Sequence, residues 1–187
     1  MPSNLLNMHE SLGTITWFDW PAVSGSAGKL IPAGGWESGL GIVATDGGVV
    51  NTSGQANEVV LLVDIANVMG SRPDGWWRDR AAAATRLLNG LAPLNGAETA
   101  APGLGTVRIT EIRAVLEGAA KRAEGPEAVS VLRAERDGDS EIVEEASQLT
   151  ASGKIPLVVT ADRGLRRRLP ERAFIVGPGW LNRLLGR

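Results

Sequence analysis

The strongest hydrophobic pattern in the chain is an uninterrupted apolar run at residues 59–63, which ends in Asp64. An apolar run of this length between turn residues predicts a strand that is buried on both faces. Strands of this kind belong to the parallel sheets of α/β folds, where ligands bind beyond the carboxyl ends of the strands. The pattern therefore predicts a central strand with a carboxylate at its functional end.

Apolar residues at helical spacing follow this strand. Steps of 4, 3, 4 and 3 join Trp77, Ala81, Ala84, Leu88 and Leu91. This spacing predicts a helix with Trp77 in the core. Trp76 lies off the stripe, so it either packs against a neighbouring loop or offers a stacking surface at the mouth of a site. Residues 91–105 are rich in Pro, Gly and Ala and predict a loop.

The remaining chain alternates apolar runs with amphipathic stretches. Strands are expected within 106–116, chiefly its last half, and at 129–133, 154–160 and 174–176. Helices are expected after Asp139, between Arg163 and Pro170, and from Pro178. Alternating strands and helices predict βαβ units. We expect a three-layer α/β/α sandwich with a mostly parallel sheet of four or five strands over residues 59–187.

Residues 1–58 differ from the rest of the chain. They contain ten of the 24 glycines, and they have one basic and five acidic side chains. Strand-like pieces occur at 15–18 and 41–45, the second followed by an Asp46-Gly47-Gly48 turn. The segment predicts a flexible or loosely docked leader. A start codon assigned too far upstream would produce the same pattern.

Composition narrows the possible chemistry. The chain has no cysteine, no tyrosine and one histidine, His9. The absence of cysteine excludes disulfides, zinc ribbons and thiol nucleophiles, and the single histidine disfavours Ser-His-Asp catalysis. The net charge of -2 gives no global sign of a nucleic-acid partner. No apolar run is long enough to span a membrane, and the start lacks a secretory signal, so we expect a cytoplasmic protein without a membrane partner.

Acidic residues mark the ends of the predicted strands. Asp64, Glu117 and Asp162 each follow a strand, and Asp139 begins a helix after another strand. Each acid alone could cap a loop or a helix. Together they would repel one another unless a cation lay among them, and carboxylates without His or Cys suit Mg²⁺ or Mn²⁺. Such ions activate water for phosphodiester hydrolysis.

Polar residues near these acids complete the candidate site. Asn67 could orient an acid or a metal-bound water, or cap the loop. Arg163, Arg166 and Arg167 could contact the phosphates of a nucleic-acid strand, or form a solvated helix face. The sequence leaves these readings open.

Three segments carry a resemblance to a known family. Residues 62–68 resemble the opening Asp-Gly-Ala/Tyr-Asn segment of NYN domains in the PIN-like nuclease superfamily. Residues 138–142 resemble the family's acidic strand-to-helix segment, and 158–165 its late strand ending in Asp. The resemblance covers residues 59–187. It implies an α/β/α sandwich that cleaves RNA with Mg²⁺ or Mn²⁺, with Asp64, Asp139 and Asp162 as metal ligands.

Under this resemblance Glu117 would be an outer or fourth acid. Two positions depart from the family pattern. Ile65 replaces a glycine and would place a β-branched side chain in a tight turn, and Ser140 replaces a second aspartate. An inactive RNA-binding or interaction module therefore remains an alternative. The same metal and acids could also support a nucleotide pyrophosphohydrolase, which acts on a smaller phosphate substrate. RNA is the expected partner, and the sequence is compatible with a homodimer.

Overall fold

The structure is a computed structural model that describes residues 42–45, 48–51 and 55–187. The strands β1 (Ile42–Thr45) and β2 (Gly48–Asn51) pair antiparallel, which confirms the strand-like stretch before the Asp46-Gly47-Gly48 turn. The predicted strand at 15–18 and His9 lie outside the described residues, as does most of the predicted leader. Among the described helices, none is long and apolar enough to cross a membrane.

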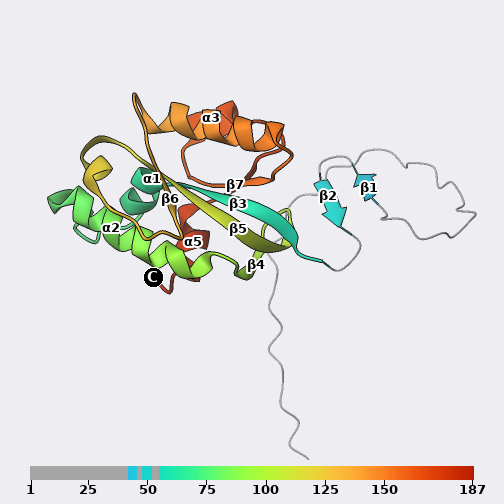
Figure 1. The fold of residues 1–187 in the computed structure, drawn as a ribbon, viewed down its shortest axis with the longest axis horizontal. Helices are drawn as coiled ribbons and strands as arrows, with labels where there is room; N and C mark the ends of the chain where they lie inside the picture. The colour runs from blue at the N-terminus through green and yellow to red at the C-terminus, as the bar shows by residue number, and fades with distance from the viewer. Residues whose placement is uncertain (1–41, 46–47, 52–54) are drawn as a thin grey trace, which may run out of the picture. The chain divides into compact units, whose positions relative to one another are not determined.

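A six-stranded sheet forms the centre of the described α/β unit (Figure 1). Its strands are β3 (Asn57–Asp64), β4 (Glu98–Ala101), β5 (Gly105–Leu116), β6 (Ser130–Arg133), β7 (Pro156–Val159) and β8 (Phe174–Val176). The order is β4-β5-β3-β7-β8, and β6 also pairs with β5. All pairs are parallel except β4 with β5. The mostly parallel sheet is therefore confirmed, with β3 at its centre, but it has six strands and not the four or five expected.

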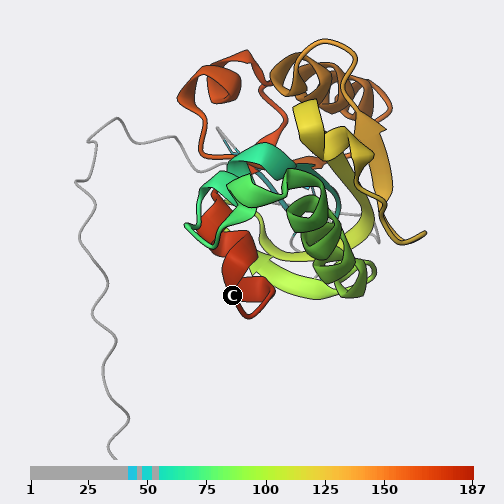
Figure 2. The same cartoon turned by 90° about the vertical axis from the view of Figure 1, so that its left-hand side faces the viewer.

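Helices cover both faces of the sheet, which confirms the expected three layers (Figures 1 and 2). The helices are α1 (Ile65–Gly70), α2 (Arg80–Leu91), α3 (Gly138–Ala151), α4 (Arg163–Arg168) and α5 (Pro178–Leu184). Helices α1, α2 and α5 pack on one face, and α3 and α4 pack on the other. Short 3₁₀ turns lie at η1 (Trp76–Arg78), η2 (Ala92–Leu94) and η3 (Gly118–Arg122).

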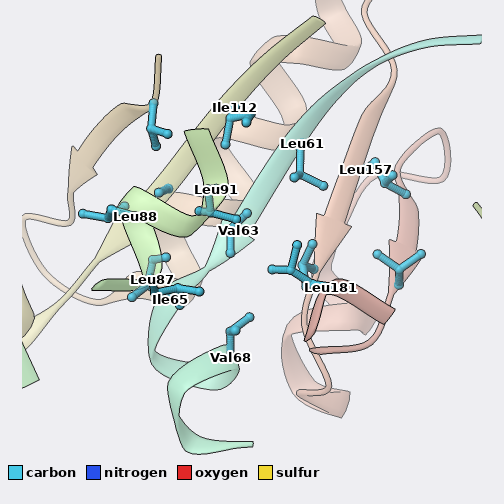
Figure 3. Close-up of a cluster of buried hydrophobic side chains, with 14 of the residues drawn as sticks. Leu61, Val63, Ile65, Val68, Leu87, Leu88, Leu91, Ile112, Leu157 and Leu181 are labelled. Atoms are coloured by element: carbon cyan, nitrogen blue, oxygen red, sulfur yellow. The ribbon is translucent and has the colours of Figure 1, made fainter. Parts of the chain in front are cut away.

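The alternation of side chains along β3 supplies both cores. Leu61 and Val63 face the larger cluster, which Figure 3 shows packed against Ile65 and Leu181 from the helices. Leu62 faces the smaller cluster under α3 and α4. Each of these side chains is fully buried, which explains why the run at 59–63 is apolar without interruption.

Two sequence-based expectations differ from the structure in this region. Residues 98–101, expected within a loop, form strand β4, because an antiparallel return onto the start of β5 pairs their backbone. Trp77 was expected in the core and is 53% exposed, whereas Trp76 packs against the larger core cluster. The reason is local, because Asp79 caps α2 and the helix begins only at Arg80. Trp77 therefore lies in the preceding 3₁₀ turn, outside the helical phase.

The strand order creates a switch point beside β3. The chain leaves β3 toward β5 and β6, and then returns through α3 to β7 on the other side of β3. The two crossings use opposite faces of the sheet, because α1 and α2 lie over one face and α3 over the other. Ligands of open α/β sheets bind at such a point, beyond the carboxyl ends of the strands. Figure 2 views the molecule from this end.

Candidate active site

The four predicted acids line one pocket at the switch point. The pocket has a volume of about 500 Å³, and Asp64, Glu117, Asp139 and Asp162 all contribute to its wall. Asn67 lines it as well. The remaining lining residues are Ala66, Gly70, Ser71, Val115, Gly138 and Ala161. The parallel sheet therefore brings together residues that are up to 98 positions apart in the sequence, from Asp64 to Asp162.

Asp64 is the buried acid of the pocket, with 8% of its surface exposed. It caps α1, because its Oδ1 accepts a hydrogen bond from the backbone N–H of Asn67 at 3.0 Å. Its Oδ2 accepts from the Thr160 hydroxyl at 3.0 Å. Burial raises the pKa of Asp64, the two hydrogen bonds oppose this shift, and the charges of Asp139 and Glu117 raise the pKa further.

Asp162 caps the helix that starts on the other side of the switch point. Its Oδ1 accepts from the N–H of Leu165 at 2.7 Å. Its own N–H donates to the Thr160 hydroxyl oxygen at 3.1 Å, so Thr160 links the two acids. Asn67 adds a second link, because its Oδ1 accepts from the N–H of Ala161 at 2.8 Å. The loop that carries Asp162 is thus tied directly to α1 and to Asp64.

Asp139 lies in the first turn of α3 but does not cap it. Asp137 does, because its Oδ1 accepts from the N–H of Ser140 at 2.7 Å. The side chain of Asp139 is half-buried and its Oδ2 lies 3.7 Å from a guanidinium nitrogen of Arg168. Burial raises the pKa of Asp139, and the charge of Asp162 raises it more than Arg168 lowers it. The simple capping explanation therefore does not apply to this acid.

Glu117 follows β5 and contacts the start of α3. Its Oε2 accepts from the N–H of Gly138 at 3.0 Å. A Cβ at Gly138 would lie 3.0 Å from the same oxygen, so a larger residue there would push the carboxylate away. Glycine at this position allows the acid to approach the backbone closely.

The predicted substrate-binding residues are arranged in different ways. Arg163 and Arg167 are exposed on α4. The guanidinium group of Arg166 donates two hydrogen bonds to the carbonyl of Thr160, at 2.7 and 3.2 Å, and so braces the loop that precedes Asp162. Trp76 does not line the acidic pocket, because it lies in a separate small pocket with Met69.

The two departures from the family pattern lie outside the pocket wall. Ile65 was expected in a tight turn beside the site, but it is the first residue of α1 and its side chain is fully buried in the larger core. Ser140 faces a different pocket, where its hydroxyl accepts a hydrogen bond from Arg168 at 3.0 Å. Neither residue lines the acidic pocket.

The acids do not form a ready-made metal cage. Within residues 42–45, 48–51 and 55–187, no three His, Asp or Glu side chains are grouped so that they could hold a metal ion. The donor chemistry nevertheless fits a hydrated hard cation, since Mg²⁺ is commonly bound by one or two carboxylates and keeps several waters. A carboxylate has about four lone-pair positions, so the hydrogen bonds to Asp64 leave acceptor capacity on its oxygens.

Two residues of the site were missed from the sequence. Thr160 is fully buried between the two acids, and Arg168 faces Asp139. A hydroxyl at the end of the apolar run 157–159 was a usable signal for Thr160, because a buried hydroxyl needs a partner. No signal distinguishes Arg168 from the neighbouring arginines of α4.

No protein-family model matches the chain, and no curated protein sequence matches it. Among solved structures, the chain is similar to the crystal structure of Rae1 (YacP) from Bacillus subtilis, a Trp-to-Leu mutant, with 20% identity and a TM-score of 0.49. The match covers 68% of this chain and 75% of that one. A likeness of this degree does not indicate what this chain binds or cleaves.

Proposed function

We propose that residues 59–187 form a metal-dependent ribonuclease domain whose site is the acidic pocket. The observation that carries the proposal is Asp139, a half-buried acid that faces other acids and caps no helix. Arg168 offsets part of the repulsion between Asp139 and Asp162, but the charge of Asp162 has the larger effect on the pKa of Asp139, so the group of acids costs the folded protein stability. Binding a cation relieves this repulsion.

Asp64, Asp139 and Asp162 would hold Mg²⁺ or Mn²⁺, directly or through water, with Glu117 as an outer acid. The ion would activate water and neutralise the charge that develops on a phosphodiester. Asn67 and Thr160 keep the loops of Asp64 and Asp162 in register, through hydrogen bonds of 2.8 and 3.0 Å. Both residues therefore position the acids and are not expected to contact the substrate.

RNA as the substrate is supported by the exposed arginines on α4. Arg163 and Arg167 are solvent-exposed and follow Asp162, so phosphates on either side of a scissile bond could reach them. Arg166 is not assigned to phosphate binding in this proposal, because its guanidinium group donates hydrogen bonds to the Thr160 carbonyl.

The test is an activity assay on the full chain with Mn²⁺, a mixed-sequence RNA and a panel of nucleoside triphosphates. We expect cleavage of the RNA, no hydrolysis of the triphosphates, and loss of cleavage when the metal is chelated. Hydrolysis of the triphosphates alone would instead identify a nucleotide pyrophosphohydrolase. RNA binding without any cleavage would identify an inactive binding module.

A pair of variants on one helix turn makes the assay specific. Asp139→Asn should lower the rate by about 10- to 100-fold or more, the range seen when groups that support a metal are removed. Asp137→Asn is the matched control, because Asp137 lies two residues away and caps α3. Asn caps helices about as well as Asp, so this control should remain active. Equal losses in both variants would contradict the proposal.

A further inference from the structure

A second pocket of the described unit combines an aromatic side chain with arginines. It has a volume of about 630 Å³ and includes Trp77, Arg78, Arg80 and Arg122. Its remaining lining residues are Asp79, Ala81 and Ala119. We call it the tryptophan pocket. No role follows for it from the acidic pocket, whose wall contains none of these residues.

Trp77 is the large hydrophobic side chain that stays exposed in the described part of the chain, at 53%. The neighbouring Trp76 contacts the ring of Trp77. The ring of Trp76 meets it edge-on, with the ring centroids 6.0 Å apart and the planes at 84°. Trp76 in turn packs against the larger core cluster. Trp77 is therefore held with its surface accessible, which is the arrangement that a stacking platform needs.

The arginines of the tryptophan pocket are available for an anionic ligand. Among the described residues, no carboxylate lies within 4.0 Å of the guanidinium nitrogens of Arg78, Arg80 or Arg122. The one acid of the pocket, Asp79, has a carboxylate oxygen that accepts from the N–H of Ala82 at 2.9 Å. Arg80 is also oriented, because its guanidinium carbon lies 5.3 Å from the centre of the Trp76 ring.

Residues that line the two pockets are close to one another in the sequence. Ser71 lines the acidic pocket, and six residues later Trp77 lines the tryptophan pocket. Glu117 lines the acidic pocket, and Ala119 and Arg122 of η3 line the second. Helix α2 also packs against η3, which closes the second pocket between them. These short connections are the path along which an RNA strand bound at the acidic pocket would extend to Trp77.

An acidic pocket by itself repels a polyanion, so the affinity for such a substrate must come from contacts elsewhere. Single-stranded nucleic acids bind where arginines contact the backbone and aromatic rings stack with bases. We infer that the tryptophan pocket is a binding site for single-stranded RNA, in which one base stacks on Trp77 and phosphates contact Arg78, Arg80 and Arg122. The inference takes RNA as the ligand from the proposed function.

The test measures binding without cleavage. The full chain is titrated in EDTA against a fluorescently labelled 12-nucleotide oligouridine RNA, and the dissociation constant is read from anisotropy. Trp77→Ala should weaken binding by about tenfold, the size expected for one lost base stack, and Trp77→Phe should restore most of it. Arg78→Ala and Arg122→Ala should each lower the slope of log affinity against log salt by about 0.7.

Two controls make the result specific. Arg172→Ala removes an exposed arginine just before β8, at the opposite edge of the sheet, and should leave the dissociation constant unchanged. Binding of a blunt RNA duplex should not depend on Trp77, because a duplex offers no unstacked base. Unchanged oligouridine binding by Trp77→Ala would overturn the inference. So would a polyglutamate peptide that binds as tightly as the RNA, since it would identify a site for an acidic protein segment.

The design separates this inference from the proposed nuclease. If Trp77 governs RNA binding in EDTA but Mn²⁺ supports no cleavage, the binding site stands and the nuclease fails. If RNA is cleaved while Trp77→Ala changes neither the dissociation constant nor KM, the nuclease stands and the binding site fails.

Discussion

The Thr160 hydroxyl donates a hydrogen bond to Oδ2 of Asp64 across neighbouring strands, at 3.0 Å. Both residues are buried, and the hydroxyl oxygen also accepts from the N–H of Asp162 at 3.1 Å. One side chain therefore sets the position of a buried acid and of the backbone that carries an exposed acid. This contact crosses the switch point of the sheet, and removing it should be detectable.

Thr160→Val should lower the free energy of unfolding by about 1–3 kcal/mol. Valine keeps the shape of threonine but leaves Oδ2 of Asp64 and the N–H of Asp162 without this partner. Urea unfolding gives the value. Thr110→Val is the control, because its hydroxyl bonds the Val59 carbonyl at 3.2 Å from an exposed position and should cost less than about 0.5 kcal/mol. Similar losses in the two variants would argue against a special role for Thr160.

Asp162→Asn should leave the melting temperature of the metal-free protein unchanged or slightly raise it, because Asn caps α4 about as well as Asp and one repelling charge is lost. It should abolish most of the stabilisation by Mn²⁺. A ligand that binds only the folded state adds about 2.7 kcal/mol at a hundredfold excess over Kd. Thermal melts with and without millimolar Mn²⁺ measure both effects.

A capping acid outside the wall of the acidic pocket controls for this substitution. Asp79 caps α2 with the same geometry, through a 2.9 Å bond to the N–H of Ala82, and does not line the acidic pocket. Asp79→Asn should keep the full response to Mn²⁺. If wild type shows no metal-dependent shift, the ribonuclease proposal fails.

Truncation of the two neighbouring tryptophans should affect stability to different extents. Trp76→Ala should cost about 2 kcal/mol, less than for a fully buried tryptophan because Trp76 is half-buried against the core. Trp77→Ala should change the free energy of unfolding by less than about 0.5 kcal/mol, because the side chain is 53% exposed. Urea denaturation of both variants measures the two losses. A larger loss for Trp77→Ala than for Trp76→Ala would contradict the arrangement of η1.

Glu111 should contribute stability that depends on pH. Burial raises its pKa, but hydrogen bonds from Lys154 and Arg113 and their charges lower it more, so the pKa lies below 4.5 in the folded protein. A lowered carboxyl pKa stabilises the fold above the unfolded-state value. That stability is lost as the pH falls through the folded-state pKa. Glu111→Gln should therefore be less stable than wild type at pH 7, and the difference should vanish under acid.

Urea midpoints between pH 7 and pH 3 test this dependence. Glu98→Gln is a suitable comparison, because the ion pair of Glu98 with Arg108 joins two side chains that are about half exposed. Exposed pairs contribute little, so this variant should track wild type closely. A constant difference between wild type and Glu111→Gln at all pH values would contradict the assignment.

The sequence by itself determined the class of fold and the positions of the acids. The apolar run at 59–63 predicted a strand covered on both faces, and the alternation of strands with helices predicted a mostly parallel sheet; the structure has both. Because parallel strands end at one edge, Asp64, Glu117 and Asp162 were expected to meet, and all three line one pocket. These inferences rest on the local spacing of apolar and polar residues, which can be read from one sequence.

Only the tertiary structure decided which groups support those acids and which side chains stay exposed. Asp137, rather than Asp139, caps α3, and Thr160 bridges two acids from the neighbouring strand. The capping bond of Asp79 moves the start of α2, which exposes Trp77 and buries part of Trp76. Such outcomes depend on which of several nearby side chains makes a capping hydrogen bond, and on contacts between residues that are far apart in the sequence, such as Asp64 and Thr160. The spacing of hydrophobic residues does not predict either of these.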